Sequence, residues 1–144
     1  MADSDSIQWN DTMLTGVDEM DVQHHILVDT LIDANARLTD DANDPLFEQI
    51  TRDLLAYAIY HFDTEEQLMM RYGYAAKAPE EAERHLNQHR RFSDRVVAMR
   101  NEARAGKPGS REALLTFLRD WLINHILTTD KELGRFVLSA TAKP

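Results

Sequence analysis

The chain has 144 residues, of which 43% are hydrophobic and 28% charged, a composition that suits one soluble globular domain. Its formal net charge of −9, with 25 acids against 16 bases, argues against nucleic acid as a partner, because phosphate binding needs clustered Lys and Arg. The absence of cysteine excludes disulfides, thiolate metal sites, iron–sulfur clusters and cysteine nucleophiles. Any metal must therefore be held by nitrogen and oxygen atoms.

The N-terminal segment is acidic, unlike a signal peptide, and no apolar run approaches the roughly 18 residues of a membrane span. We therefore expect a cytoplasmic protein without a membrane span.

Apolar residues recur at helical spacing through most of the chain. Residues 1–17 lack a clear period and are expected to form an extended arm, with Trp9 packed on the domain. Helices are predicted at about 18–39, 44–72, 79–105 and 110–129, followed by a short C-terminal helix at 131–140. Four helices of similar length with short connections pack with neighbours antiparallel. The expected fold is all-α: one domain, 1–144, built as an up-down-up-down antiparallel four-helix bundle.

The helix ends carry recognisable signals. Asp18 and Ser110 are expected to cap the first and fourth helices, because their side chains can accept hydrogen bonds from backbone N–H groups. Asp44-Pro45 is expected to open the second helix and Gly73 to end it. The turn before the second helix is predicted at Asp40-Asp41-Ala42-Asn43.

Polar side chains interrupt the apolar helix faces. His61 and Glu65 lie one turn apart on the second helix, on the face that carries its apolar residues. Five of the six histidines lie on such faces, and all four helices contribute: His24, His61, His85, His89 and His125. One buried imidazole is usually an ordinary core residue, but five with a carboxylate need partners that helix backbones do not offer. Imidazole and carboxylate are both ligands of first-row metals, so a metal site is the simplest explanation.

The fourth helix adds Asp130, five positions after His125. Five residues rotate about 500° along an ideal helix, so these two side chains would not face the same way. We expect a π-bulge, or a helix break at Thr128-Thr129, that turns both inward. The alternative is that Asp130 is a solvent-facing acid ahead of Lys131.

Other metal sites need different spacing. A zinc metalloprotease helix needs Glu directly after the first His of the pair, but Leu86 follows His85. Ferritin-like di-iron oxidases need Glu three residues before an inward His, and none of the five histidines has one. The expected site is therefore rich in histidine and poor in carboxylates.

Four motifs together resemble the hemerythrin family, closest to the stand-alone bacteriohemerythrins. They span most of the chain: Asp21-x-Gln23-His24, His61-Phe62-x-x-Glu65-Glu66-x-Leu68-Met69, His85-x-x-x-His89-x-x-Phe92 and Trp121-Leu122-x-x-His125-x-x-x-x-Asp130. The resemblance implies a cofactor of two iron ions, a non-haem di-iron centre with an oxo or hydroxo bridge. It also implies that His85, His89 and His125 bind one iron and that His24 and His61 bind the other. The carboxylates of Glu65 and Asp130 would bridge the two irons.

The iron with fewer protein ligands would keep an open position for dioxygen. Its surroundings are expected to be small and apolar, since water and anions promote autoxidation. By the family pattern Leu122 and Ile126 lie beside this position, with Phe62 and Trp121 behind them. The alternative is that these four residues are ordinary core.

The function implied by the resemblance is reversible dioxygen binding, for storage, delivery or sensing, without enzymatic turnover. A di-iron enzyme that reduces peroxide or nitric oxide is one alternative, and a structural or iron-storing bundle is another. The carrier and the enzyme differ in turnover and not in ligands, so the sequence leaves both open. The oligomeric state and any protein partner are open as well. Glu65→Ala is expected to lose the paired site, whereas Glu66 is expected to point elsewhere and to be dispensable.

Overall fold

The computed structural model describes residues 9–38 and 45–141, and the regular structure in these ranges is helical. The helices are α1 (Asp18–Arg37), α2 (Pro45–Tyr72), α3 (Tyr74–Lys77), α4 (Pro79–Arg104), α5 (Ser110–Asn124) and α6 (Lys131–Thr141). A short 3-10 turn, η2 (Asp11–Met13), precedes α1, and a π-helical segment, η3 (His125–Asp130), joins α5 to α6. No helix in the described ranges has the length and apolar character needed to cross a membrane.

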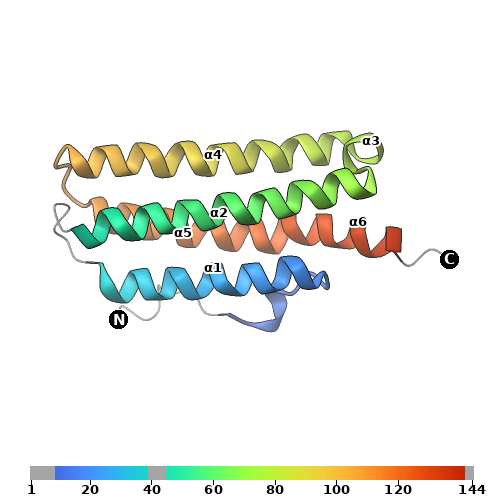
Figure 1. The fold of residues 1–144 in the computed structure, drawn as a ribbon, viewed down its shortest axis with the longest axis horizontal. Helices are drawn as coiled ribbons and strands as arrows, with labels where there is room; N and C mark the ends of the chain where they lie inside the picture. The colour runs from blue at the N-terminus through green and yellow to red at the C-terminus, as the bar shows by residue number, and fades with distance from the viewer. Residues whose placement is uncertain (1–8, 39–44, 142–144) are drawn as a thin grey trace.

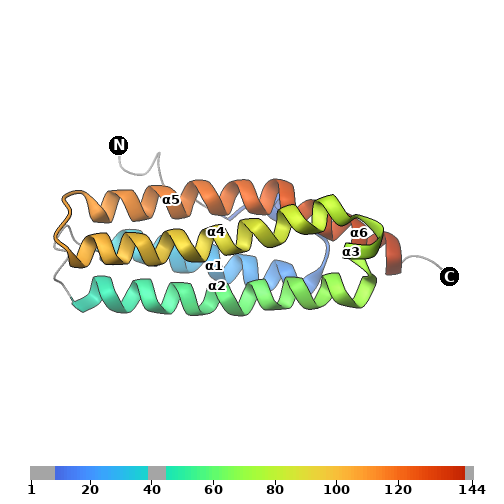
Figure 2. The ribbon, with the colours of Figure 1, turned by 90° about the horizontal axis from the view of Figure 1, so that it is seen from above.

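Four long helices, α1, α2, α4 and α5, lie side by side along the long axis of the molecule (Figures 1 and 2). α1 packs against α2 and α5, and α4 packs against the same two helices from the other side. The expected all-α helical bundle is confirmed. The short α3 was not predicted; it lies at the end of the bundle where α2 gives way to α4, and it contacts both.

The core consists of two apolar clusters with a polar layer between them. On α1, His24 lies between Met20 of the smaller cluster and Leu27 of the larger one. On α2, the buried pair His61 and Glu65 is bracketed in the same way by residues of the two clusters. Burial of the two apolar clusters therefore holds the polar groups in one layer away from water.

Several predicted helix ends are confirmed and two are wrong. Pro45 is the first residue of α2, and Gly73, with φ +72°, follows its last residue. The N-cap of α1 is Val17 and not Asp18, and the N-cap of α5 is Gly109 and not Ser110. The Ser110 hydroxyl instead donates to the carbonyl of Lys107. The predicted turn at residues 40–43 and the Asp44 cap lie outside the described residues.

Asp21, in the first turn of α1, holds the segment that precedes the helix. Its Oδ1 accepts hydrogen bonds from the backbone N–H and the hydroxyl of Thr15, each at 2.8 Å, and its Oδ2 accepts from the N–H of Gly16 at 3.0 Å. Trp9 stacks on the exposed ring of His25, with ring centroids 4.7 Å apart. The segment before α1 is thus fixed to that helix at two places.

The irregularity expected near the end of the fourth long helix is a π-helix, η3, that starts at His125 and ends at Asp130. A π-helix bonds each residue to the one five positions away, so residues five apart come to face the same side. His125 is 2% exposed and Asp130 is fully buried, which excludes the alternative of a solvent-facing Asp130. The prediction of a π-bulge is confirmed.

The position of Gly134 in α6 generates a stability prediction. A Cβ at Gly134 would lie 2.9 Å from the Thr15 Cβ and 3.1 Å from the Thr15 carbonyl oxygen, and neither atom is the end of a flexible side chain. Alanine gains about 1 kcal/mol of helix propensity, but overpacking costs about 1–3 kcal/mol, so Gly134→Ala should lower the free energy of unfolding by up to about 2 kcal/mol. Chemical denaturation measures this change.

Ser139→Ala on the exposed face of α6 is the control and should change the free energy of unfolding by less than about 0.5 kcal/mol. A Gly134→Ala protein more stable than wild type would contradict the close approach of α6 to Thr15.

Candidate metal centre

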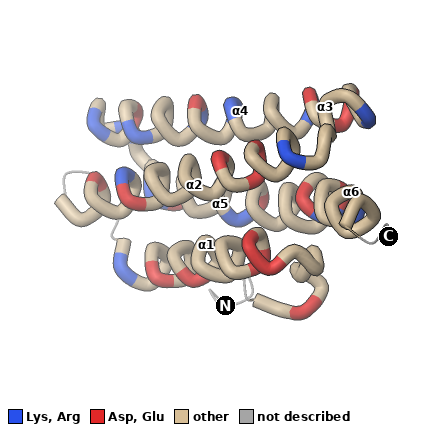
Figure 3. Tube along the Cα trace, turned by 45° about the vertical axis from the view of Figure 1, so that its right-hand side comes forward, with Lys and Arg blue, Asp and Glu red and all other residues tan. Residues whose placement is uncertain are grey.

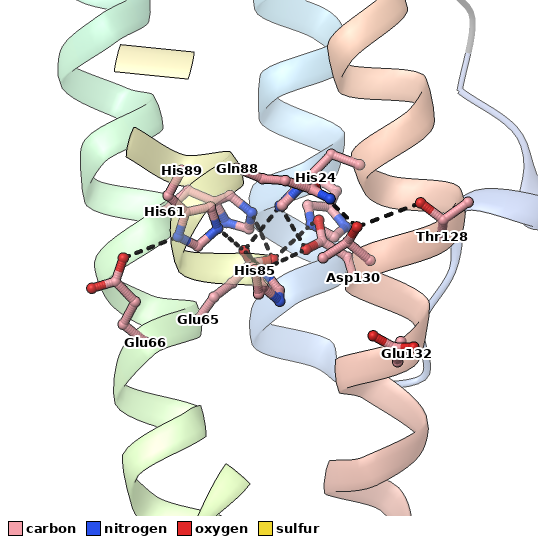
Figure 4. Close-up of polar contacts among 12 residues, drawn as sticks. His24, His61, Glu65, Glu66, His85, Gln88, His89, Thr128, Asp130 and Glu132 are labelled. Carbon is pink, nitrogen blue, oxygen red and sulfur yellow. Dashed lines mark hydrogen bonds and ion pairs between the residues drawn. The ribbon is translucent and has the colours of Figure 1, made fainter. Parts of the chain in front are cut away.

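Seven polar side chains meet in the layer between the two apolar clusters (Figure 4). They come from α1, α2, α4 and η3, and none is more than 3% exposed. They are the sequence-predicted ligands: His24, His61, Glu65, His85, His89, His125 and Asp130. The structure therefore brings together every residue that the sequence singled out for this site.

Glu65 presents its two carboxylate oxygens to two different groups of imidazoles. Its Oε1 lies 3.1 Å from Nε2 of His85 and 2.9 Å from Nε2 of His89. Its Oε2 lies 3.2 Å from Nε2 of His24 and 3.0 Å from Nε2 of His61. One carboxylate thus faces histidines of α4 with one oxygen and histidines of α1 and α2 with the other.

Asp130 is divided in the same way from the opposite side of the layer. Its Oδ1 lies 3.1 Å from Nε2 of His85 and 2.9 Å from Nε2 of His125, and its Oδ2 lies 2.7 Å from Nε2 of His24. The donor atoms form two groups, and within each group all of them lie within 4.8 Å of one another. The first group consists of Glu65, His85, His89 and His125. The second group consists of His24, His61, Glu65 and Asp130.

Two glutamines orient histidines of the site from behind. The Nδ1–H of His61 donates to Oε1 of Gln23 at 2.7 Å, and the Nδ1–H of His125 donates to Oε1 of Gln88 at 2.6 Å. The Thr129 hydroxyl also donates to Gln88, at 2.9 Å. With Nδ1 carrying the proton, Nε2 keeps its lone pair toward the centre of the layer, which is the tautomer a metal ligand needs.

Glu66 orients the imidazole of His89 in the same way. The expectation that Glu66 points away from the site is wrong. Its Oε2 accepts a hydrogen bond from the Nδ1–H of His89 at 3.0 Å, although the Glu66 side chain is 42% exposed. The role of Gln88 was not predicted from the sequence either. The available signal was that a buried imidazole needs an acceptor for its second nitrogen, but spacing along one helix does not tell which residue of a neighbouring helix provides it.

The buried charges shift the ionisation of the site strongly. Burial disfavours the protonated forms of His24 and His85, but the carboxylates of Asp130 and Glu65 outweigh burial and raise the pKa of His24 to about 10 and that of His85 to about 9. Burial raises the pKa of Glu65, yet the imidazoles, His61 foremost, hold it well below its usual range. Protons on histidines therefore balance the carboxylates at neutral pH, in the place that a metal cation would take.

The polar atoms of this layer fit a metal ion better than they fit one another. Nε2 of His61, Nε2 of His125 and both oxygens of Asp130 are buried without a hydrogen-bond partner among the described residues. Leaving a buried polar atom unsatisfied costs about 1–3 kcal/mol, and more for a charged group. Imidazole nitrogens and carboxylate oxygens that converge in this way, several of them without a hydrogen-bond partner, are the donor set that first-row metals bind.

A small cavity of about 20 Å³ adjoins the polar layer. His61, His125 and Asp130 reach it from the layer, and the other lining side chains are apolar. Leu122, Phe62 and Trp121 are among these apolar residues, whereas Ile126, which is fully buried, does not line the cavity. The space is comparable with the roughly 10–15 Å³ that one water molecule needs, so it suits a diatomic molecule.

Comparisons with known proteins point to one family. Residues 15–137 match the family model described as the hemerythrin HHE cation binding domain. The chain is 32% identical over 123 residues to the bacteriohemerythrin of Stenotrophomonas maltophilia, with 85% of this chain and 76% of the relative covered. It is 32% identical over 123 residues to the bacteriohemerythrin of Methylococcus capsulatus, with 83% and 87% covered, and 30% identical over 122 residues to that of Pseudomonas aeruginosa, with 85% and 75% covered.

The positions of Glu65 and Glu66 generate a prediction on metal binding. Glu65→Ala should lose both metal ions, because both donor groups share this carboxylate. Glu66→Ala should keep two metal ions per chain but bind them about tenfold more weakly, since removing an acceptor behind a ligand typically costs 10–100-fold in affinity. Metal content after anaerobic loading and affinity from chelator competition measure these effects.

Asp63→Ala, which removes another exposed acid of α2, is the matched control and should bind metal as the wild type does. Loss of metal from all three variants, or from none, would contradict this division of roles.

Proposed function

Because this chain belongs to the hemerythrin family, we propose that it binds dioxygen reversibly at a pair of non-haem iron ions. One observation carries the proposal: two buried carboxylates each present one oxygen to each of two groups of imidazoles. Such an arrangement suits two metal ions that share bridging ligands. The donor groups make a purely structural bundle a poor alternative, because such a bundle would bury these charged and polar atoms without partners.

The proposed ligand set follows from which oxygen faces which imidazole. One iron is assigned His85, His89 and His125, and the other is assigned His24 and His61. Both share the carboxylates of Glu65 and Asp130. The second iron has one protein ligand fewer, so it offers the place for dioxygen. Two ferrous ions bound by these residues would supply the reversible two-electron chemistry that dioxygen binding needs.

The histidine-rich ligand set supports a carrier over an enzyme. Five neutral imidazoles contribute no negative charge, whereas additional carboxylates would stabilise the ferric state and favour onward oxidation of a substrate. Gln23, Gln88 and Glu66 hold three of the imidazoles by their Nδ1–H groups, which limits rearrangement when the charge on the metal changes.

The apolar cavity supports the same proposal. Leu122 and Phe62 have no polar side-chain atoms and offer a water molecule no hydrogen-bond partner, whereas dioxygen needs none. These side chains would therefore admit dioxygen and disfavour the water and anions that displace it.

The proposed frame for this site is an antiparallel up-down-up-down bundle within one domain. The colour gradient in Figure 1 supports this order, since it runs in opposite directions along α1 and α2 and again along α4 and α5. Storage, delivery and sensing of dioxygen are all compatible with this proposal.

Reversible oxygenation tests the function directly. Protein loaded with ferrous iron without oxygen should hold two irons per chain and develop a coloured charge-transfer band on exposure to air. The band should disappear on purging with inert gas and return on re-exposure. One-way bleaching to a ferric product, or consumption of peroxide or nitric oxide over many turnovers, would overturn the carrier function in favour of an enzyme.

Leu122→Ala tests the role of the cavity. Enlarging it should let water reach the iron pair and accelerate autoxidation by about tenfold, a change of about 1.4 kcal/mol in the barrier. The decay of the oxygenated band measures the rate.

Leu115→Ala is the matched control, because Leu115 lies on the same helix with the same 7% exposure but does not line the cavity. Both variants lose about 2–5 kcal/mol of core packing. Equal autoxidation rates in the two variants would show that the Leu122 effect is one of stability alone.

A further inference from the structure

An open groove of about 650 Å³ runs along the surface between α4 and α5, apart from the enclosed cavity. Its volume is in the range of small-molecule sites, about 300–1,000 Å³. At one end it reaches Gln88 and His125, the hydrogen-bonded pair at the edge of the metal layer. A molecule in this groove would therefore lie close to the proposed iron pair without entering the core.

The two walls of the groove differ in chemistry. Arg91 and Arg95 lie one turn apart on α4, and Phe117 and Trp121 lie one turn apart on α5. Residues four apart on a helix share a face. Two guanidinium groups thus stand opposite two aromatic rings, which suits a ligand that carries both a planar ring and negative charge.

The arginines of the groove are not neutralised within the protein. Among the described residues, neither Arg91 nor Arg95 has an ion-pair or hydrogen-bond partner, whereas Arg84 pairs with Glu132 and Arg104 with Glu48. Asp94 lies on the same wall and leaves a net charge of one positive unit there. α4 carries six arginines in a chain with net charge −9, and Figure 3 shows basic positions along α4, whereas α1, on the opposite side of the bundle, carries mainly acidic ones. The positive charge of this groove therefore attracts anions.

Trp121 connects the groove to the metal layer. Its ring stacks on that of His125, with centroids 4.3 Å apart and planes 15° from parallel. The same ring lines both the surface groove and the internal cavity. A ring bound against Trp121 would thus be separated from a proposed iron ligand by a single aromatic side chain.

We propose that this groove binds a planar redox ring bearing phosphate, such as flavin mononucleotide or a reduced nicotinamide nucleotide, and is the entry point for electrons that restore an oxidised centre. This role rests on the proposed function. The reduced flavin anion gives up two electrons and one proton and becomes oxidised flavin; the two electrons would convert two ferric ions to two ferrous ions, and the proton passes to the solvent in the open groove. Arg91 and Arg95 hold the phosphate, and Phe117 and Trp121 hold the ring.

Equilibrium dialysis tests the site independently of iron. Metal-free and iron-loaded protein should each bind one flavin mononucleotide or one reduced nicotinamide nucleotide per chain, and the two probes distinguish the ring that is preferred. Riboflavin, which lacks the phosphate, should bind about tenfold more weakly than flavin mononucleotide, as expected for the loss of charge-assisted hydrogen bonds. The double variant Arg91→Gln/Arg95→Gln should weaken binding of the preferred probe by about the same factor.

Arg90→Gln is the matched control, because Arg90 is an exposed arginine of α4 that does not line the groove. It should bind the preferred probe as the wild type does. Saturable binding lost only in the double variant supports the site. Absence of binding for both probes, or equal binding by wild type and double variant, overturns it.

The rate of reduction of the air-oxidised protein separates the two proposals. The reduced form of the preferred probe should reduce the wild-type centre about tenfold faster than that of the double variant, whereas reduced riboflavin, which lacks the phosphate, should reduce both at similar rates. Selective binding without a difference in reduction rate overturns the electron-entry role. If iron does not load in pairs, the proposed function fails while the dialysis result still decides whether the groove is a binding site.

Discussion

The structure depends on two buried carboxylates, Glu65 and Asp130, that are shared between two groups of imidazoles. Ionised groups in an apolar core are costly unless they are paired, and these two are fully buried. The histidines His24 and His85 have raised pKa values and balance the charge with their protons, and metal ions would balance it in the proposed centre. Two apolar clusters, one on each side, hold this layer in place, so packing of the core positions the donor groups.

The π-helical segment η3 shows how the backbone adapts to this need. A regular helix would direct His125 and Asp130 to different sides, and the wider turn brings both into the layer. The same region supplies Thr129, which donates to Gln88 and so helps to orient His125. Local irregularity, ligand placement and hydrogen bonding behind the ligand are therefore features of one segment.

The site residues could be predicted from the sequence because each violates a regular pattern within its own helix. A histidine in an apolar stripe, or an acid at a spacing of five, is visible without knowledge of the neighbouring helix. The roles of Glu66 and Gln88 were not predictable in this way, because their hydrogen bonds depend on how α2, α4 and η3 are rotated against one another. The cap at Asp18 was wrong for a related reason: the chain before α1 is held by Asp21, through contacts that helix-end statistics do not include. The cap at Ser110 was wrong because its hydroxyl donates to the carbonyl of Lys107 and Gly109 is the N-cap.

The central claim is that two metal ions share the two carboxylates, and Mössbauer spectroscopy of iron-loaded, air-oxidised protein tests it most directly. The account predicts two iron environments in equal amount, because one group of donors contains three histidines and the other two. It also predicts strong antiferromagnetic coupling between the irons, with no magnetic splitting in an applied field beyond that of the field itself. Two uncoupled high-spin ferric ions, or a single iron per chain, would contradict the shared site.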